Sequence, residues 1–321
     1  MNPDNEAGRI APTPPAADAQ GSAIRCQVQD LRLRYQHDGF VFPLEAIDRG
    51  EAQRILQLFE AQQLRARGKS RGRSRQRPHL LFTWIDALVR HPRILDAVEA
   101  VLGPDLLCWN SGFFIKAPHD ERFVSWHQDA AFFGLSEPRL CTAWIALSPA
   151  TAESGCMQML PGSHHLSRPH VQTFASNNML SRGQTLADPI DPRHARPVLL
   201  EPGQFSLHHG LTAHRSEPNH SALSRVGLAI RYIAPEVRQT LSRRDTAVLV
   251  RGRDRHAHFE LLDPPDADLS PRAVQRHRHA LKLAQDILYT GLTARAGRAR
   301  PEDGRTPAGS AGRSFADPGT S

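Results

Sequence analysis

The sequence predicts a mainly β fold of the α+β type: a double-stranded β-helix (jelly-roll or cupin-like) core with flanking N-terminal helices and a C-terminal helix. Helical patterns come first, and short runs rich in β-branched and aromatic residues follow, divided by Gly and Pro turns. The loops between these runs are long, which suits a jelly roll that encloses a pocket at one end. A composition of 40% hydrophobic and 23% charged residues is typical of one globular domain.

Three segments have the spacing of apolar residues expected for amphipathic helices. The first spans residues 47–64 and follows a turn at Asp38-Gly39 and a short strand. The second spans 92–102, with Pro92 at its start and Gly103 just after its end. The third spans 274–288, after Ser270 and Pro271, which form an N-cap and N1 pair.

Six runs have the composition of strands, and the sequence predicts them at 106–116, 124–129, 141–147, 156–160, 203–209 and 226–233. The segment 163–202 between two of them is too long for a hairpin. A loop of this length inside a compact domain usually has a function, so we predict that it is an active-site lid.

The ends of the chain differ in composition from its centre. Residues 1–25 and 293–321 are rich in Pro, Ala, Gly and polar residues without periodicity, so we predict disordered tails around one catalytic domain, 26–292.

The formal net charge of +7 has a local source. Seven cations and no acid lie between Arg65 and Arg77, which equals the whole net charge. We interpret residues 65–77 as a solvated loop, with a flexible contact for anions near the site entrance as the alternative. The segment has no interleaved aromatic residues for base stacking, so we expect no nucleic-acid partner.

Several classes of protein are not expected from this sequence. Without an apolar run of 18 or more residues we expect no contact with a membrane, and the N-terminal residues lack the pattern of a secretory signal. The four cysteines, at 26, 108, 141 and 156, form no Cys-x-x-Cys pair, so neither a zinc knuckle nor a disulfide framework is indicated. We expect a cytoplasmic protein with reduced thiols.

The chemistry is predicted to centre on Trp126-His127-Gln128-Asp129. Two residues separated by one position on a strand point to the same face, so His127 and Asp129 can coordinate one ion. With a second His from elsewhere they would form a facial triad that leaves three metal positions open, the arrangement of non-haem Fe(II) oxygenases. In a chain with 17 His, the alternative is an ordinary hydrogen-bonded pair at a strand end.

The second histidine is not fixed by these residues alone. The run from Leu207 to His214 contains three histidines, at 208, 209 and 214, and each is a candidate for the distal ligand. His164 and His165 also compete.

Together these motifs resemble the phytanoyl-CoA dioxygenase family of Fe(II)- and 2-oxoglutarate-dependent oxygenases. The resemblance runs from about residue 35 to 233 and includes His-x-Asp, the turn Pro-Gly-Ser-His at 161–164, and His-Arg-Ser-Glu-Pro-Asn at 214–219. An arginine, Arg225, follows 11 positions after His214, as in the family. This register favours His214 as the distal ligand, with His209 as the alternative.

The resemblance implies a jelly-roll fold, Fe(II) held by His127, Asp129 and His214, 2-oxoglutarate and O2 as cosubstrates, and ascorbate as a candidate stimulant. A guanidinium can bind a carboxylate in a bidentate manner, so Arg225 is expected to hold the far carboxylate of 2-oxoglutarate. The family also implies a cosubstrate role for Lys116; an exposed strand-end cation is the alternative. Phe132, Phe133 and Trp144 are expected in the core or pocket wall.

We therefore expect an enzyme, a 2-oxoglutarate-dependent dioxygenase that hydroxylates a small organic molecule and releases succinate and CO2. A specialised metabolite or an acyl-type molecule is the expected kind of substrate. Desaturation or cyclisation by the same class of enzyme is one alternative. A non-catalytic metal-binding jelly-roll protein is the other.

Overall fold

The computed structural model describes residues 16–66, 72–180 and 183–296. The helices that organise it are α1 (Ala16–Asp38), α2 (Arg49–Arg65), α4 (Thr83–Val89), α5 (Pro92–Leu102), α6 (Ala130–Phe133) and α7 (Pro271–Ala296). The strands are β1 (Phe40–Glu45), β2 (Leu106–Lys116), β3 (Val124–His127), β4 (Leu140–Ala146), β5 (Met157–Met159), β6 (His170–Gln172), β7 (Gln184–Leu186), β8 (Arg196–Val198), β9 (Gln204–His209), β10 (His214–Ser216), β11 (Arg225–Ile233), β12 (Thr246–Arg251) and β13 (Glu260–Leu261).

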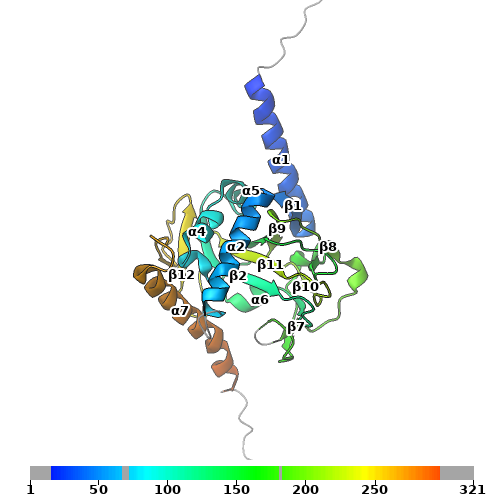
Figure 1. The fold of residues 1–321 in the computed structure, drawn as a ribbon, viewed down its shortest axis with the longest axis vertical. Helices are drawn as coiled ribbons and strands as arrows, with labels where there is room; N and C mark the ends of the chain where they lie inside the picture. The colour runs from blue at the N-terminus through cyan, green and yellow to red at the C-terminus, as the bar shows by residue number, and fades with distance from the viewer. Residues whose placement is uncertain (1–15, 67–71, 181–182, 297–321) are drawn as a thin grey trace, which may run out of the picture.

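Within these residues the strands form a large sheet, a smaller sheet and a separate hairpin. The large sheet has the order β1-β9-β4-β11-β2-β12-β13, and the smaller one has the order β3-β10-β5-β8. Strands β6 and β7 pair with each other. The two larger sheets provide the jelly-roll core that the sequence predicts, with helices flanking it (Figure 1).

The central strand β11 shows how the two faces of the large sheet differ. Its even positions, including Val226, Leu228 and Tyr232, belong to the main hydrophobic core. Its odd positions Arg225, Ala229 and Arg231 line a cavity on the other face. Because side chains alternate across a strand, one buried strand serves both the helix-covered core and the interior of the jelly roll.

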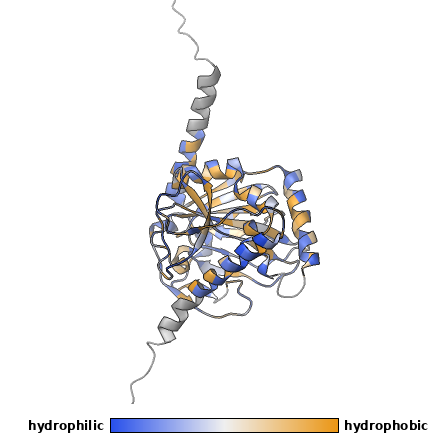
Figure 2. Cartoon of the chain, turned by 90° about the vertical axis from the view of Figure 1, so that its left-hand side faces the viewer, coloured by the Kyte–Doolittle hydropathy of each residue, from blue (hydrophilic) through white to orange (hydrophobic). Residues whose placement is uncertain are grey.

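The main core lies between the large sheet and the helices α2, α4 and α5. Ile55, Phe59, Ile85 and Ile94 from these helices belong to the same cluster as β11. The Tyr232 hydroxyl donates to the Val89 carbonyl over 2.8 Å, which satisfies a buried polar group at this interface. Hydrophobic residues accordingly concentrate in the strands of the interior and on parts of the helices that cover them (Figure 2).

Most of the predicted elements are confirmed. Helix α5 has the expected bounds, and its end coincides with Gly103, whose φ of 104° favours glycine. Strand β2 also has the expected bounds, and the other predicted strands lie within one or two residues of their predicted positions. Helices α4 and α6 and the strands β10, β12 and β13 were not predicted.

The terminal helices extend into the segments predicted as tails. Helix α1 begins at Ala16 and α7 continues to Ala296, so the tail bounds 1–25 and 293–321 and the domain bounds 26–292 stay predictions. Residues 1–15 and 297–321 lie outside the described residues.

The segment 163–202 is not a single irregular loop. It carries the hairpin β6–β7 and the strand β8, which pairs with β5 at the edge of the smaller sheet. Asn178 within it donates from Nδ2 to Ser125 Oγ over 2.8 Å, and the cavity is lined by Leu180. The segment therefore covers the edge of the smaller sheet.

The basic segment 65–77 is solvated only in part. Arg77 is 3% exposed, and its Nη1 donates to Thr246 Oγ1 over 2.9 Å while Nη2 lies 3.5 Å from Asp245 Oδ1. Arg75 Nε donates to Gln63 Oε1 over 2.7 Å. The prediction of a solvated loop is therefore wrong for Arg77. Residues 67–71 lie outside the described residues.

In the part of the chain that the structure describes, none of the helices combines the length and the apolar character that a membrane span needs.

The interior face of β11 depends on a glycine. A Cβ added to Gly227 would overlap the indole ring of Trp144. We predict that Gly227→Val displaces Trp144 and lowers the free energy of unfolding by about 1–3 kcal/mol, the usual cost of overpacking. Chemical denaturation measures this change.

Gly112 on the adjacent strand β2 provides the matched control. A Cβ there would lie 3.6 Å from the Arg75 carbonyl oxygen, an ordinary contact, so Gly112→Ala should leave stability nearly unchanged. Equal destabilisation by both substitutions would contradict this explanation.

Candidate active site

Three buried side chains converge inside the jelly roll. His127, Asp129 and His214 each offer one ligand atom, and these atoms lie within 4.8 Å of one another. His127 and His214 are Cα partners on the neighbouring strands β3 and β10, and their ring centroids are 4.1 Å apart. The three residues that the sequence predicts as metal ligands therefore lie together, and they could hold a metal ion.

Both imidazoles are fixed through their Nδ1 atoms. His127 Nδ1 donates to the Ser125 carbonyl and His214 Nδ1 donates to the Thr212 carbonyl, each over 2.9 Å. This leaves the Nε2 lone pairs free for an ion, the outer-shell arrangement common around metal-binding histidines. Burial, together with the neighbouring His127 and His208, holds the pKa of His214 well below its usual value, so this imidazole is neutral as a ligand must be.

Asp129 reaches the site by a route that differs from the sequence prediction. Strand β3 ends at His127, and Asp129 has helical backbone angles at the start of α6, so the two residues do not share a strand face. The buried Gln128 between them fixes this corner: its Nε2 donates to the carbonyls of Leu166 and Leu211 over 2.8 and 2.7 Å. The prediction of convergence is right, but its geometric reason was wrong.

The two oxygens of Asp129 face different neighbours. Oδ1 lies 3.4 Å from His127 Nε2, whereas Oδ2 lies 3.5 Å from Thr142 Oγ1 and 3.4 Å from Arg231 Nε. Burial by itself would raise the pKa of Asp129, but the charge of Arg231 and the neighbouring imidazoles outweigh it, and the pKa lies well below its usual value. The carboxylate is therefore ionised, with one oxygen turned toward the metal-binding position.

Arg225 lies in the same cavity, on the opposite sheet. Its guanidinium is 5.5 Å from the ring centroid of Trp144, and its Nη1 donates to the Gly155 carbonyl. Nε has no hydrogen-bond partner among the described residues. Burial lowers the pKa of Arg225 to about 10, so it stays charged at neutral pH. His214 begins β10 rather than ending a strand, so the two residues meet across the sheets and not through a simple turn.

Lys116 lies beside Arg225 but outside the cavity lining. The two residues are Cα partners on β2 and β11, and Lys116 Nζ donates to the Glu217 carbonyl. The interpretation as an exposed cation is wrong, because Lys116 is fully buried. Burial, and then the charge of Arg225, lower its pKa to about 7.

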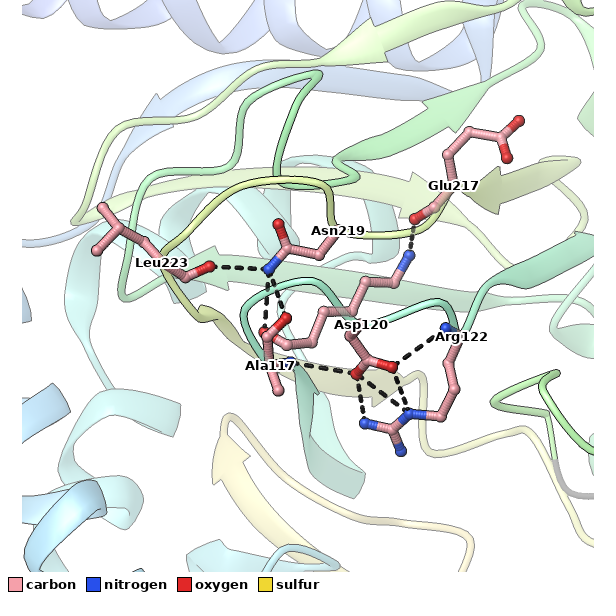
Figure 3. A network of polar contacts seen from close by, with 7 residues as sticks. Ala117, Asp120, Arg122, Glu217, Asn219 and Leu223 are labelled. Atoms are coloured by element: carbon pink, nitrogen blue, oxygen red, sulfur yellow. Dashed lines mark hydrogen bonds and ion pairs between the residues drawn. The ribbon is translucent and has the colours of Figure 1, made fainter.

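The turn between β10 and β11 is held by Asn219. Its Nδ2 donates to the carbonyls of Ala117 and Leu223 over 2.7 and 2.8 Å (Figure 3). Near it, the carboxylate of Asp120 pairs with Arg122 over 2.5 Å. These contacts fix the segment that leads from His214 to Arg225.

Two further residues lie at the site: Arg231, which no sequence motif indicated, and His208, which the sequence indicated only as an alternative ligand. Arg231 Nε and both ring nitrogens of His208 are buried without a hydrogen-bond partner among the described residues. His208 Nε2 lies 4.0 Å from Asp129 Oδ2. The alternation of side chains along β11 could have indicated Arg231. It lies an even number of residues after Arg225 on the same strand, so both side chains point to the same face.

His209, the alternative distal ligand, points elsewhere. Its Nδ1 accepts a hydrogen bond from Leu211 N over 3.0 Å, and its ring packs against Tyr35 and His164. It is not among the described residues that line the cavity with His127, Asp129 and His214. The turn around Gly162 contacts the neighbouring backbone: Ser163 Oγ accepts from Ala213 N over 2.9 Å, and His164 Nε2 donates to the Gln36 carbonyl over 3.1 Å.

The cavity combines the ionisable groups with an apolar wall. Its described lining is Phe114, Val124, His127, Asp129, Thr142, Trp144, Met157, Leu180, His208, His214, Arg215, Ser216, Arg225, Ala229 and Arg231. Trp144 is thus part of the pocket wall, whereas Phe133 packs against Trp109.

Comparison with known families identifies the chain's relatives. A family model described as phytanoyl-CoA dioxygenase (PhyH) matches residues 35–227, more than half of the chain. The chain belongs to this family. The match covers the triad and Arg225, and it ends just after the start of β11.

Individual relatives of this phytanoyl-CoA dioxygenase family member come from distant sources. A Stutzerimonas stutzeri protein named "probable alpha-ketoglutarate-dependent hypophosphite dioxygenase" is 34% identical over 164 residues, which are 50% of this chain and 57% of that protein. The mouse phytanoyl-CoA dioxygenase domain-containing protein 1 is 35% identical over 150 residues, 43% of this chain and 48% of the mouse protein. The chain thus spans about half the length of the curated relatives it matches.

A solved structure matches over a larger share. The non-haem monooxygenase ThoJ, in its apo form, is 35% identical with a TM-score of 0.74, covering 82% of this chain and all of ThoJ. This similarity extends the jelly-roll fold to most of the described residues.

We predict that His127→Ala, Asp129→Ala and His214→Ala each abolish stoichiometric binding of Fe(II), because two remaining donors hold a divalent ion poorly. Metal content after anaerobic loading and desalting checks this. His209→Ala is the matched control and should keep full metal content. If the His214 variant retains its iron and the His209 variant loses it, the distal ligand is His209 and not His214.

Proposed function

We propose that this chain is an Fe(II)- and 2-oxoglutarate-dependent dioxygenase that hydroxylates an unactivated C–H bond of a small organic molecule. In the reaction, 2-oxoglutarate and O2 are consumed, one oxygen atom enters the product, and succinate and CO2 are released. The observation that carries this proposal is the buried triad of His127, Asp129 and His214 in one cavity with Arg225.

The donor set fits Fe(II). Two imidazoles and one carboxylate on one side of an ion leave the other side open, which suits non-haem iron that also binds a bidentate cosubstrate and O2. When bound, the ferrous ion and 2-oxoglutarate together supply the activation of O2. The chain itself holds the ligands, positions the cosubstrate and excludes water.

Arg225 is the proposed partner of the far carboxylate of 2-oxoglutarate. Its Nε has no hydrogen-bond partner in the described part of the chain, and its guanidinium lies 5.5 Å from the ring centroid of Trp144, so a guanidinium edge is available for bidentate binding. Lys116, next to it on β2, would add a second positive charge. The apolar side chains of Trp144, Met157 and Phe114 line the same cavity as Arg225 and the triad.

The segment 163–202 is the proposed lid over the part of the cavity where the substrate would bind. Leu180 from this segment lines the cavity, so its movement would open or close the site. This supports the lid role predicted from its length.

A screen for succinate release tests the function directly. Small organic molecules, and hypophosphite because of the Stutzerimonas relative, are incubated with the Fe(II)-loaded protein, and succinate and products are measured. A product with one added oxygen atom supports hydroxylation. Loss of two hydrogens would indicate desaturation or cyclisation, and the absence of iron-dependent succinate with and without added substrate would favour a non-catalytic binding protein.

We predict that Arg225→Ala weakens binding of 2-oxoglutarate by about 2–5 kcal/mol, because a buried charged hydrogen-bond partner is lost. Arg225→Lys should weaken it less, since charge remains but the planar fork is lost. Calorimetric titration of the metal-loaded protein measures both. An unchanged affinity in the Ala variant would remove Arg225 from the cosubstrate site.

We also predict that binding of 2-oxoglutarate weakens as pH rises through about 7. Lys116 has a pKa lowered to about 7, so it is charged below this pH and neutral above it, whereas Arg225, with its pKa of about 10, stays charged throughout. Titrations on both sides of this pH measure the dependence. Lys116→Met should remove it, and a pH dependence that survives the substitution would show that another group is responsible.

The reaction should be hydroxylation and not halogenation. A carboxylate at the position of Asp129 occupies the metal site that a halide would need and adds negative charge that opposes it. Reaction in saturating chloride or bromide, with product analysis by mass spectrometry, is the test. Any halogenated product from the unmodified protein would show that Asp129 is not a ligand.

A further inference from the structure

The residues of β11 that face the cavity begin and end with an arginine. Arg225, Gly227, Ala229 and Arg231 alternate with the core-facing residues, so they point to the same side of the sheet. Arg225 and Arg231 both line the cavity, and the small residues between them leave room. Only the Arg225 end is assigned to the cosubstrate.

Arg231 is held so that its hydrogen-bond donors stay available. Its guanidinium lies 5.1 Å from the ring centroid of Phe133 and 5.9 Å from that of Phe114, and such stacking occupies the faces of the guanidinium rather than its edges. Its Nε is 3.4 Å from Asp129 Oδ2, yet it has no hydrogen-bond partner among the described residues.

His208 adds a polar group beside Arg231. It is 2% exposed, and neither ring nitrogen has a hydrogen-bond partner in the described part of the chain. It lies 4.0 Å from Asp129 Oδ2 on the side of the cavity where Arg231 lies, and an imidazole ring can offer an N–H donor to a ligand there. Leaving such a buried group unpaired costs free energy, which a ligand in the cavity would recover.

The charges of the cavity do not balance once the site is loaded. Asp129 is the single acidic residue of its described lining. The two charges of the ion and that of Arg225 offset Asp129 and the two carboxylates of 2-oxoglutarate. Arg215 is already paired with Glu217 over 2.8 Å. The charge of Arg231 is therefore left over, and a charged Lys116 would add to the excess.

Arg231 Nε lies 3.4 Å from Asp129 Oδ2, but a bound ion would share that carboxylate. A loaded site would then hold one positive charge in excess, which an anion at this end would offset. On the basis of the proposed function, we infer that the primary substrate carries an anionic group, a carboxylate or a phosphorus oxyanion, which Arg231 and His208 bind at the end of the cavity opposite Arg225.

Arg231 is also accessible from a second cavity. Arg231 and Phe114 line the active cavity and a neighbouring one, whose lining includes Arg75, Arg77 and Asn110 and, among the described residues, no acid. Asn110 is the Cα partner of Arg231 on β2. This neighbouring space offers room for the rest of a substrate whose anionic group lies at Arg231.

The test measures binding, not turnover. The protein is loaded with Ni(II), which takes the same donors without reacting with O2, and with saturating 2-oxoglutarate. Acetate and methylphosphonate, with acetamide as the uncharged control, are then titrated by calorimetry. We expect at least one anion to bind and acetamide not to bind; the anion with the higher affinity identifies the substrate group.

Two arginines of the same cavity provide the matched comparison. Arg231→Gln should weaken anion binding by about tenfold or more, about 1.4 kcal/mol or more, whereas Arg215→Gln, which removes an already paired charge, should not. No anion binding by the wild-type protein, or equal binding by the Arg231 variant, would overturn the inference.

A second variant covers the case in which Arg231→Gln no longer holds nickel. His208→Phe keeps a planar aromatic ring but removes both ring nitrogens, and it should weaken anion binding severalfold; unchanged binding would equally contradict the inference. Binding of Ni(II) and 2-oxoglutarate is recorded first in the same experiment. Its failure would refute the proposed function, whereas intact cosubstrate binding without an anion site would refute only the inference about the substrate.

Discussion

The interior of this jelly roll buries charged groups, and each of them needs a compensating partner. In water two exposed charges contribute little, but inside a protein an unpaired charge is strongly destabilising. Asp129 lies among two imidazoles and Arg231, and Arg225 is held by Trp144 and a backbone carbonyl. A divalent cation at the triad, whose ligand atoms lie within 4.8 Å of one another, would add a further partner for Asp129, so the burial that makes pairing necessary also suits the site to binding charged ligands.

Strand β11 links this interior to the rest of the domain. Because its side chains alternate, the strand that carries the two cavity arginines also packs Val226, Leu228 and Tyr232 against the helices. The helix-covered core thereby fixes the positions of Arg225 and Arg231. Gly227 leaves space for the indole of Trp144, which in turn lies under the Arg225 guanidinium. Helix packing on one face of the sheet thus determines the geometry of the pocket on the other.

The ligands of the smaller sheet are fixed mainly by hydrogen bonds to the backbone. Each histidine of the triad donates from Nδ1 to a carbonyl two residues earlier in the chain, which sets its tautomer before any ion binds. Gln128 connects the corner after β3 to two other segments, and Asn219 connects the turn before β11 to the end of β2. Polar residues that do not touch the ion therefore account for much of the precision of the site.

The sequence by itself determined the fold class and the bounds of α5 and β2, because these depend on local periodicity. It also indicated His127 and Asp129 by their spacing, whereas His214 was favoured over His208 and His209 only by the resemblance to the family motif that ends at Arg225. It did not determine that Asp129 leaves its strand, that Arg77 is buried against Asp245, or that Arg231 and His208 flank the metal site. Each of these facts depends on contacts between residues far apart in the sequence. Only the tertiary structure brings such charges within a few ångströms of one another, and at that distance burial and pairing decide what each group can bind.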